Sequence, residues 1–162
     1  MSYLFVALSY LIGSINFAYL VAKYKKLDIS SSGSGNPGTS NVMRTIGKKY
    51  AAIVLIGDVF KGFIPIFLFD ENLLLCGFAA VIGHIYPIFY KFKGGKGVAT
   101  YIGVYIAFST LNPISYDLFE NSYFLFLNIP VLAIFYFVVF KISRISAIAS
   151  LLTVFISNLI LF

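Results

Sequence analysis

The chain has 162 residues, of which 60% are apolar and only 11% charged, whereas a soluble domain carries roughly a quarter charged residues. So little charge cannot cover a water-facing surface, which excludes a soluble enzyme, a disordered chain and, with Cys76 as the single cysteine, a disulfide scaffold. The net charge of +6 does not indicate a nucleic-acid partner, because the basic residues punctuate apolar segments and do not form one patch.

These exclusions leave an all-α, polytopic helical membrane protein. A transmembrane helix needs about 20 apolar residues, with a range of about 17–25. We expect about six transmembrane helices in one domain over residues 1–162, at residues 3–22, 50–69, 73–90, 98–112, 123–140 and 145–162. No basic segment or small-residue cleavage site precedes the first, so we predict a retained helix and not a signal peptide.

The basic residues predict the orientation of these helices. Every Lys and Arg except Lys61 falls in the connections after the first, third and fifth spans. The other connections carry only acidic charges, at Asp70, Glu71, Asp117 and Glu120. By the positive-inside rule the basic connections lie in the cytoplasm, which places both termini outside.

The connection after the first span is rich in glycine and hydroxyl residues: residues 30–41 read Ser-Ser-Ser-Gly-Ser-Gly-Asn-Pro-Gly-Thr-Ser-Asn. Composition alone is typical of a flexible linker. Asn36 followed by Pro37, however, matches an N-cap and a first helical position. We therefore expect a short interfacial helix over residues 38–49.

That helix would place Arg44 and Lys48 one turn apart on one face. Free amides at its start and the Arg44 guanidinium would form a cradle for an oxyanion, together with the hydroxyls of Ser34, Thr39 and Ser40. The residues alone leave a simple loop and a ligand site both open.

Two polar features lie inside the predicted spans. Asp58 and Lys61 are three residues apart on one helix face, and charges at that depth usually face the bundle interior. They either form a mutual salt bridge that fixes packing, or Lys61 serves a phosphate site while Asp58 orients it.

His84, about two turns from the cytoplasmic end of its span, is the only histidine, so a metal site is not expected. A hydrogen bond between helices and a general-base role both remain open for it.

Residues 93–97 read Lys-Gly-Gly-Lys-Gly at the cytoplasmic start of the fourth span. The spacing does not fit a Walker A loop, but glycines allow close approach of a ligand to the main chain, and the following helix directs its positive end at the loop. A membrane anchor with a turn is the alternative. The second, fourth and sixth spans all begin at the cytoplasmic side beside basic residues. If these helix N-termini lie close together, the inner membrane face would hold a ligand that joins a phosphate to an acyl tail.

These segments resemble the bacterial acyl-phosphate:glycerol-3-phosphate acyltransferase family (PlsY-type). The resemblance rests on residues 33–44, 57–62, 83–87 and 92–100, with weaker similarity at 13–15 and 141–147. It implies an inner-membrane enzyme of phospholipid biosynthesis, without a cofactor, that transfers a fatty acyl group from acyl phosphate to the 1-hydroxyl of glycerol 3-phosphate. The products are 1-acyl-glycerol 3-phosphate (lysophosphatidic acid) and phosphate. Its partners would be both substrates, membrane lipid and an enzyme that produces acyl phosphate, with no nucleic acid.

The resemblance also suggests roles for individual residues. The candidate catalytic residues are Ser34, Arg44 and His84, and Asp58 is a candidate orienting residue. The candidate substrate-binding residues are Asn36, Thr39, Asn41, Lys61, Lys93, Gly94, Gly95, Lys96, Gly97, Ser143 and Ser146. We expect direct acyl transfer, with His84 or a substrate phosphate as the base, because a mixed anhydride needs mainly juxtaposition and charge screening. No base is evident beside Ser34 for an acyl-serine intermediate.

Two departures from the family pattern stand out. Asn16 replaces a common proline, and a seventh span with a His-Arg-x-x-Asn-like tail does not follow before Phe162, so we expect a chain that is short at its C-terminus. A phosphate-ester transporter or binding protein, and an inactive truncated family member, are the alternative functions.

Overall fold

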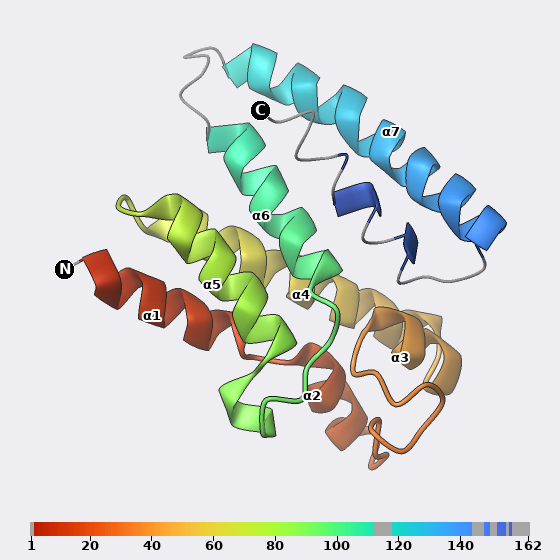
Figure 1. Ribbon diagram of the computed structural model, residues 1–162. Helices are drawn as coiled ribbons and strands as arrows, with labels where there is room; N and C mark the ends of the chain where they lie inside the picture. Colours follow the sequence, from red (N-terminus) through yellow and green to blue (C-terminus); the bar gives the residue numbers. More distant parts are fainter. Residues whose placement is uncertain (1, 112–117, 144–147, 150–151, 155, 157–162) are drawn as a thin grey trace. The chain divides into compact units, whose positions relative to one another are not determined.

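The computed structural model describes residues 2–111, 118–143, 148–149, 152–154 and 156, and over these residues its regular structure is entirely helical (Figure 1). The chain forms two compact units, Met1–Tyr105 and Ile106–Phe162. The described helices long and apolar enough to cross a membrane cover Tyr3–Tyr24, Lys48–Leu68 and Leu73–Tyr90, and shorter apolar helices cover Val98–Thr110 and Pro130–Ser143. The helical membrane class is thereby confirmed, whereas the number of six spans and the outward position of the termini remain predictions.

The first span consists of two helices, α1 (Ser2–Gly13) and α2 (Phe17–Tyr24), and not of one continuous helix. Asn16 is the physical reason for the break, because its side-chain oxygen accepts a hydrogen bond from the Tyr19 amide at 3.1 Å and caps α2. The Ile15 carbonyl, freed by the break, accepts a hydrogen bond of 2.6 Å from Lys61 Nζ. A polar backbone group inside the span is thus paired within the protein.

The predicted interfacial helix over residues 38–49 is shorter than expected. Helix α3 covers Thr39–Thr45, and its N-cap is Gly38 rather than Asn36, so the predicted Asn36–Pro37 cap is wrong. Gly47 has a φ of +116°, a conformation that favours glycine, and there the chain turns into α4 (Lys48–Leu68). Arg44 and Lys48 therefore lie on different helices, and the prediction that they share a helix face is also wrong.

Helices α5 (Leu73–Ile85) and α6 (Val98–Leu111) are joined through a short 3-10 helix, η1 (Ile88–Tyr90). Glycines allow very close packing of these helices on their neighbours. A Cβ added to Gly13 of α1 would overlap the Ala80 carbonyl of α5, and one added to Gly62 of α4 would overlap the Thr100 carbonyl of α6. Small residues at such crossings are typical of membrane helices.

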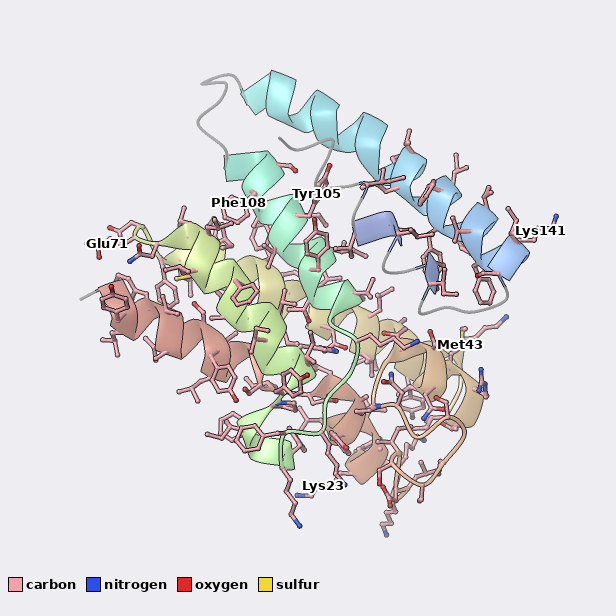
Figure 2. All side chains as sticks on the ribbon, viewed as in Figure 1. Lys23, Met43, Glu71, Tyr105, Phe108 and Lys141 are labelled. Atoms are coloured by element: carbon pink, nitrogen blue, oxygen red, sulfur yellow. The ribbon has the colours of Figure 1, made fainter. Side chains whose placement is uncertain are left out.

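The first unit has an acidic end and a basic end. Figure 2 shows Glu71, between α4 and α5, far from Lys23 near the end of α2. Helix α3 and the connection that leads into α6 lie toward the end of the unit at which α2 ends (Figure 1), and Lys23 is labelled at that end in Figure 2. Within the described part of the first unit, the acidic connection and the basic connections therefore lie at different ends, and the serine-rich segment and residues 93–97 lie at the basic end.

The second unit contains α7 (Leu118–Ser143), a helix longer than the span predicted over residues 123–140. Within it Tyr136 stacks on Phe140 with ring centroids 6.2 Å apart. The span predicted over residues 145–162 falls largely outside the described residues.

Candidate active site

The serine-rich segment forms a turn that is built around the side chain of Asn41. Asn41 is 2% exposed; its side-chain oxygen accepts from the Ser34 amide at 2.9 Å, and its Nδ2 donates to the carbonyls of Ser32 (2.9 Å) and Ile29 (3.4 Å). Buried Ile29 and Val42 anchor this turn to the apolar core of the first unit. The segment is therefore an ordered turn, which we call the serine turn (residues 28–38).

The local sequence explains the shape of the serine turn. Asp28 accepts hydrogen bonds from the amide and hydroxyl of Ser30 (2.9 and 2.6 Å), and these bonds hold the pKa of the carboxyl below its usual value. Gly33 and Gly35 have φ values of +61° and +71°, and a Cβ on Gly33 would overlap the side-chain oxygen of Asn41. The Gly-Ser-Gly sequence thus allows the chain to close on Asn41 while the Ser34 side chain stays exposed.

We expect Asn41→Ala to loosen the serine turn, because the three hydrogen bonds of this buried side chain disappear together. A loss of about 1–3 kcal/mol in the free energy of unfolding is expected. Limited proteolysis should then cut the turn at a rate well above wild type. Ser31→Ala, which removes only an exposed hydrogen bond of the same turn, from Ser31 Oγ to the Asp28 carbonyl at 3.2 Å, is the matched control; equal cleavage of both variants would contradict this role of Asn41.

The second segment, residues 93–97, which we call the glycine-lysine turn, contacts both α5 and the serine turn. The Gly95 amide donates to the His84 carbonyl at 3.2 Å. A Cβ on Gly95 would overlap His84 Nε2 and would lie 3.2 Å from the Pro37 carbonyl. The same carbonyl accepts a bond of 3.4 Å from Asn16 Nδ2. The two turns that the sequence predicts to converge therefore touch each other.

Beneath these turns lies a buried polar cluster of Asp58, Lys61, His84 and Thr100, each at most 3% exposed. Asp58 Oδ1 lies 2.9 Å from Lys61 Nζ and 3.6 Å from His84 Nδ1. Thr100 Oγ1 lies 3.1 Å from the same His84 nitrogen. The cluster links α4, α5 and α6.

The contacts in this cluster bear on the two roles that the sequence leaves open for Lys61 and for His84. Lys61 bonds the Ile15 carbonyl as well as Asp58, so its ammonium serves helix packing in this structure. His84 forms a hydrogen bond between helices, as one interpretation predicted. It lies about two turns before Tyr90, the end of the span, as the sequence predicts, and within the last turn of α5, which ends at Ile85, two residues before Pro87.

The remaining candidates differ in exposure. Exposed side chains belong to Ser34, Arg44, Lys93 and Lys96; half-buried residues are Asn36, Thr39 and Gly94; Gly95 and Gly97 are buried. Ser143 is the last residue of α7 in the second unit, and Ser146 lies outside the described residues. The basic end thus offers exposed cations next to a backbone turn in which a side chain would not fit.

An apolar groove of about 460 Å³ opens between α2 and α4. Its lining combines aromatic and aliphatic side chains with one lysine: Phe17, Leu20, Val21, Tyr24, Lys49, Tyr50 and Ile53. Nearby, Lys25 Nζ lies 4.3 Å from the centroid of the Tyr50 ring. Hydrogen bonding to Tyr50 raises the pKa of Lys25, so this cation stays charged beside the groove.

Sequence reasoning missed two residues of this region. Asn16 is both the N-cap of α2 and a donor to Pro37, and its position before an apolar helical segment was an available capping signal. Thr100 is the partner of the His84 ring, and no spacing rule predicts this contact, because the two residues lie on different helices.

Comparison with known proteins places these features in context. The family model described as "Glycerol-3-phosphate acyltransferase" matches residues 3–162. The glycerol-3-phosphate acyltransferase of Aquifex aeolicus is 47% identical over 111 residues, and that of Methylobacillus flagellatus is 50% identical over 115 residues. The alignments cover 64% and 66% of this chain, and the chain spans 58% of the length of each relative.

Solved structures agree with the sequence comparison. The crystal structure of PlsY (YgiH), an integral membrane glycerol 3-phosphate acyltransferase, in its glycerol 3-phosphate form superposes with a TM-score of 0.78 at 35% identity. That alignment covers 99% of this chain and 76% of the solved chain. The lysophosphatidic acid form gives a TM-score of 0.63 at 31% identity and covers 98% and 85% of the two chains.

Proposed function

Since this chain belongs to the glycerol-3-phosphate acyltransferase family, we propose that it transfers a fatty acyl group from acyl phosphate to the 1-hydroxyl of glycerol 3-phosphate. The products are 1-acyl-glycerol 3-phosphate and inorganic phosphate, and the reaction needs no cofactor. The observation that carries this proposal is the contact of the serine turn with the glycine-lysine turn at Pro37 and Gly95. It brings two backbone turns and several cations to one end of a multi-pass membrane protein.

The proposed step is direct acyl transfer. The glycerol oxygen attacks the acyl carbonyl carbon, the bond from that carbon to the phosphate oxygen breaks, and the phosphate leaves with the electron pair. Both substrates are phosphorylated, so their repulsion must be screened while the reacting atoms are held close. Arg44, Lys93 and Lys96 are exposed at the basic end, and we assign them this screening role. The half-buried side chains of Asn36 and Thr39 are further candidate contacts.

The hydroxyl proton passes to His84 or to a substrate phosphate. His84 Nε2 faces Gly95, which is the side from which a substrate on the glycine-lysine turn would approach. Asp58, 3.6 Å from the other ring nitrogen, would orient the imidazole. For Ser34 we propose a substrate hydrogen bond instead of acylation, with its amide held by Asn41 at 2.9 Å.

The polarity of the groove and the distribution of charge suggest where the acyl chain binds and on which side of the membrane the active site lies. The groove between α2 and α4 is apolar, with Lys49 in its lining, and we assign it to the acyl chain of the donor. The separation of basic from acidic connections supports an active site at the cytoplasmic face of the bacterial inner membrane. Functional coupling to an enzyme that produces acyl phosphate would supply the donor.

The direct experiment supplies the purified chain, in lipid vesicles, with palmitoyl phosphate and labelled glycerol 3-phosphate. We expect labelled lysophosphatidic acid and release of phosphate in equal amounts. The Aquifex aeolicus relative, assayed in parallel, serves as the positive control. Product from the relative and none from this chain would exclude the activity and favour a family member without catalysis.

We expect Arg44→Ala and Lys96→Ala to raise the KM for glycerol 3-phosphate by about 10- to 100-fold, because a charge-assisted hydrogen bond contributes about 1.5–3 kcal/mol. Lys23→Ala removes an exposed cation near the end of α2, and its KM should stay near wild type. Equal effects of all three substitutions would contradict direct substrate contacts of Arg44 and Lys96 and would indicate an effect of general surface charge.

One observation bears on a phosphate-ester transporter as a second candidate. The first span is interrupted at residues 14–16, and interrupted helices are typical of transport sites. Here, however, the freed Ile15 carbonyl is bonded by Lys61, so it is already paired. Uptake of labelled glycerol 3-phosphate into sealed proteoliposomes, without acyl phosphate, would decide for transport.

A further inference from the structure

The break in the first span ends at Asn16, a fully buried residue whose side chain has partners at both of its polar atoms. Its oxygen accepts a hydrogen bond from the Tyr19 amide at 3.1 Å, and its Nδ2 donates to the Pro37 carbonyl at 3.4 Å. One side-chain amide therefore joins the start of α2 to the serine turn.

The oxygen of Asn16 also supports the glycine-lysine turn, through a pair of stacked rings. By capping α2 it fixes the first turn of that helix, which carries Tyr19. The Tyr19 ring stacks on the ring of Tyr90 in η1, with centroids 4.6 Å apart and an interplanar angle of 7°. The Tyr90 carbonyl in turn accepts a hydrogen bond of 3.0 Å from the amide of Lys93, the first residue of the glycine-lysine turn.

The nitrogen of Asn16 acts where the two turns touch. Pro37 is buried, so its carbonyl depends on donors within the protein, and Asn16 supplies one. A Cβ on Gly95 would lie only 3.2 Å from the same carbonyl. The position of the Pro37 carbonyl therefore sets how closely the serine turn approaches the glycine-lysine turn.

We propose that Asn16 is a positioning residue that holds the serine turn at a fixed distance from the glycine-lysine turn. Its two hydrogen bonds tie both turns to one point of the first span. The catalytic consequence rests on the proposed acyl transfer. Arg44, in the helix after the serine turn, and Lys96, in the glycine-lysine turn, hold the two phosphorylated substrates in reacting geometry only while this distance is kept. The distance itself does not depend on the reaction.

A distance measurement between two spin labels, on the full chain in lipid vesicles, tests the positioning role directly. Ser31→Cys in the serine turn and Phe92→Cys just before the glycine-lysine turn place the labels at exposed positions, whereas the natural cysteine is buried. With Asn16 present, pulsed electron paramagnetic resonance should give one narrow distribution of distances. Asn16→Ser keeps a capping hydroxyl for α2 but does not reach the Pro37 carbonyl, so the distribution should broaden or shift.

Two further variants make the comparison specific. Ser9→Ala removes a buried hydroxyl of the same span that donates to the Phe5 carbonyl of its own helix at 2.7 Å, and the distribution should stay unchanged. Asn16→Thr supplies another capping hydroxyl without a donor that reaches Pro37, so it should behave as Asn16→Ser does. It decides the question should Asn16→Ser not fold. An unchanged distribution in a folded Asn16 variant overturns the inference.

Steady-state kinetics provide the second readout. Asn16→Ser should lower kcat about 10- to 100-fold with less than about a threefold change in the KM for glycerol 3-phosphate. Each turn keeps its own substrate contacts, whereas a displacement of about 1 Å between the reactants can cost about 100-fold in rate. Ser9→Ala should keep the wild-type kcat. A wild-type kcat in Asn16→Ser, or a loss confined to KM, would overturn the catalytic consequence.

The two readouts separate the inference from the proposed function. If the labels report the expected change but the wild type forms no lysophosphatidic acid, the proposed function fails and the positioning role of Asn16 stands. If the wild type is active and the distances are the same with and without Asn16, the positioning role fails and the proposed function stands.

Discussion

Replacement of Lys61 by methionine is expected to destabilise the protein by about 3–5 kcal/mol, the usual cost of leaving one partner of a buried ion pair uncompensated. Asp58 is 1% exposed and lies 2.9 Å from the ammonium group that would be lost. The Ile15 carbonyl would also lose its donor in the break of the first span. The effect should appear as a large fall in the unfolding midpoint of the protein in detergent micelles.

The double variant Asp58→Asn/Lys61→Met provides the decisive comparison. It removes both charges, so most of the lost stability should return, because replacing a whole buried pair by neutral groups is often nearly neutral. Lys23→Met, at an exposed position near the end of α2, controls for the loss of a lysine as such. Equal stability of the single and double variants would show that the uncompensated charge of Asp58 is not the cause.

Gly95→Ala is expected to lower kcat/KM at least about 100-fold while the protein remains folded. The added methyl group would overlap His84 Nε2 and press on the Pro37 carbonyl, which lies 3.2 Å away. The ring cannot turn aside easily, because Thr100 holds its other nitrogen at 3.1 Å. The glycine-lysine turn must then move, and a displacement of about 1 Å at a reacting centre can cost about 100-fold in rate.

Steady-state kinetics with both substrates, together with the unfolding midpoint, would test this expectation. Phe92→Ala, an exposed substitution in the same connection, should leave kcat/KM within about threefold of wild type. Wild-type kinetics for Gly95→Ala would contradict the arrangement of His84 beneath the turn.

The sequence was sufficient to predict the helical membrane class, because apolar length and the placement of charge are local properties of the chain. The meeting of the two turns could also be anticipated, since both follow spans that end on the basic side. The ion pair of Asp58 and Lys61 was one of two interpretations, and their i, i+3 spacing made it available.

The local errors have a tertiary cause. Asn36 and Pro37 have the composition of a helix start, but the Pro37 carbonyl is bonded by Asn16, 21 residues earlier in the chain, and α3 begins only after Gly38. The Ile15 carbonyl, freed by the break of the first span, is likewise bonded by Lys61, 46 residues away in the chain. No window of neighbouring residues contains either contact.

The hydrogen bond from Gly95 to the His84 carbonyl has a consequence for evolution. It ties together the two ends of the excursion over residues 85–94, so the geometry at those ends does not depend on the length of chain between them. Lys91 and Phe92, both exposed and both with positive φ, form an open corner of that excursion. Insertions at this corner of the present chain should be tolerated, because doubling a loop costs only about 0.6 kcal/mol of closure entropy.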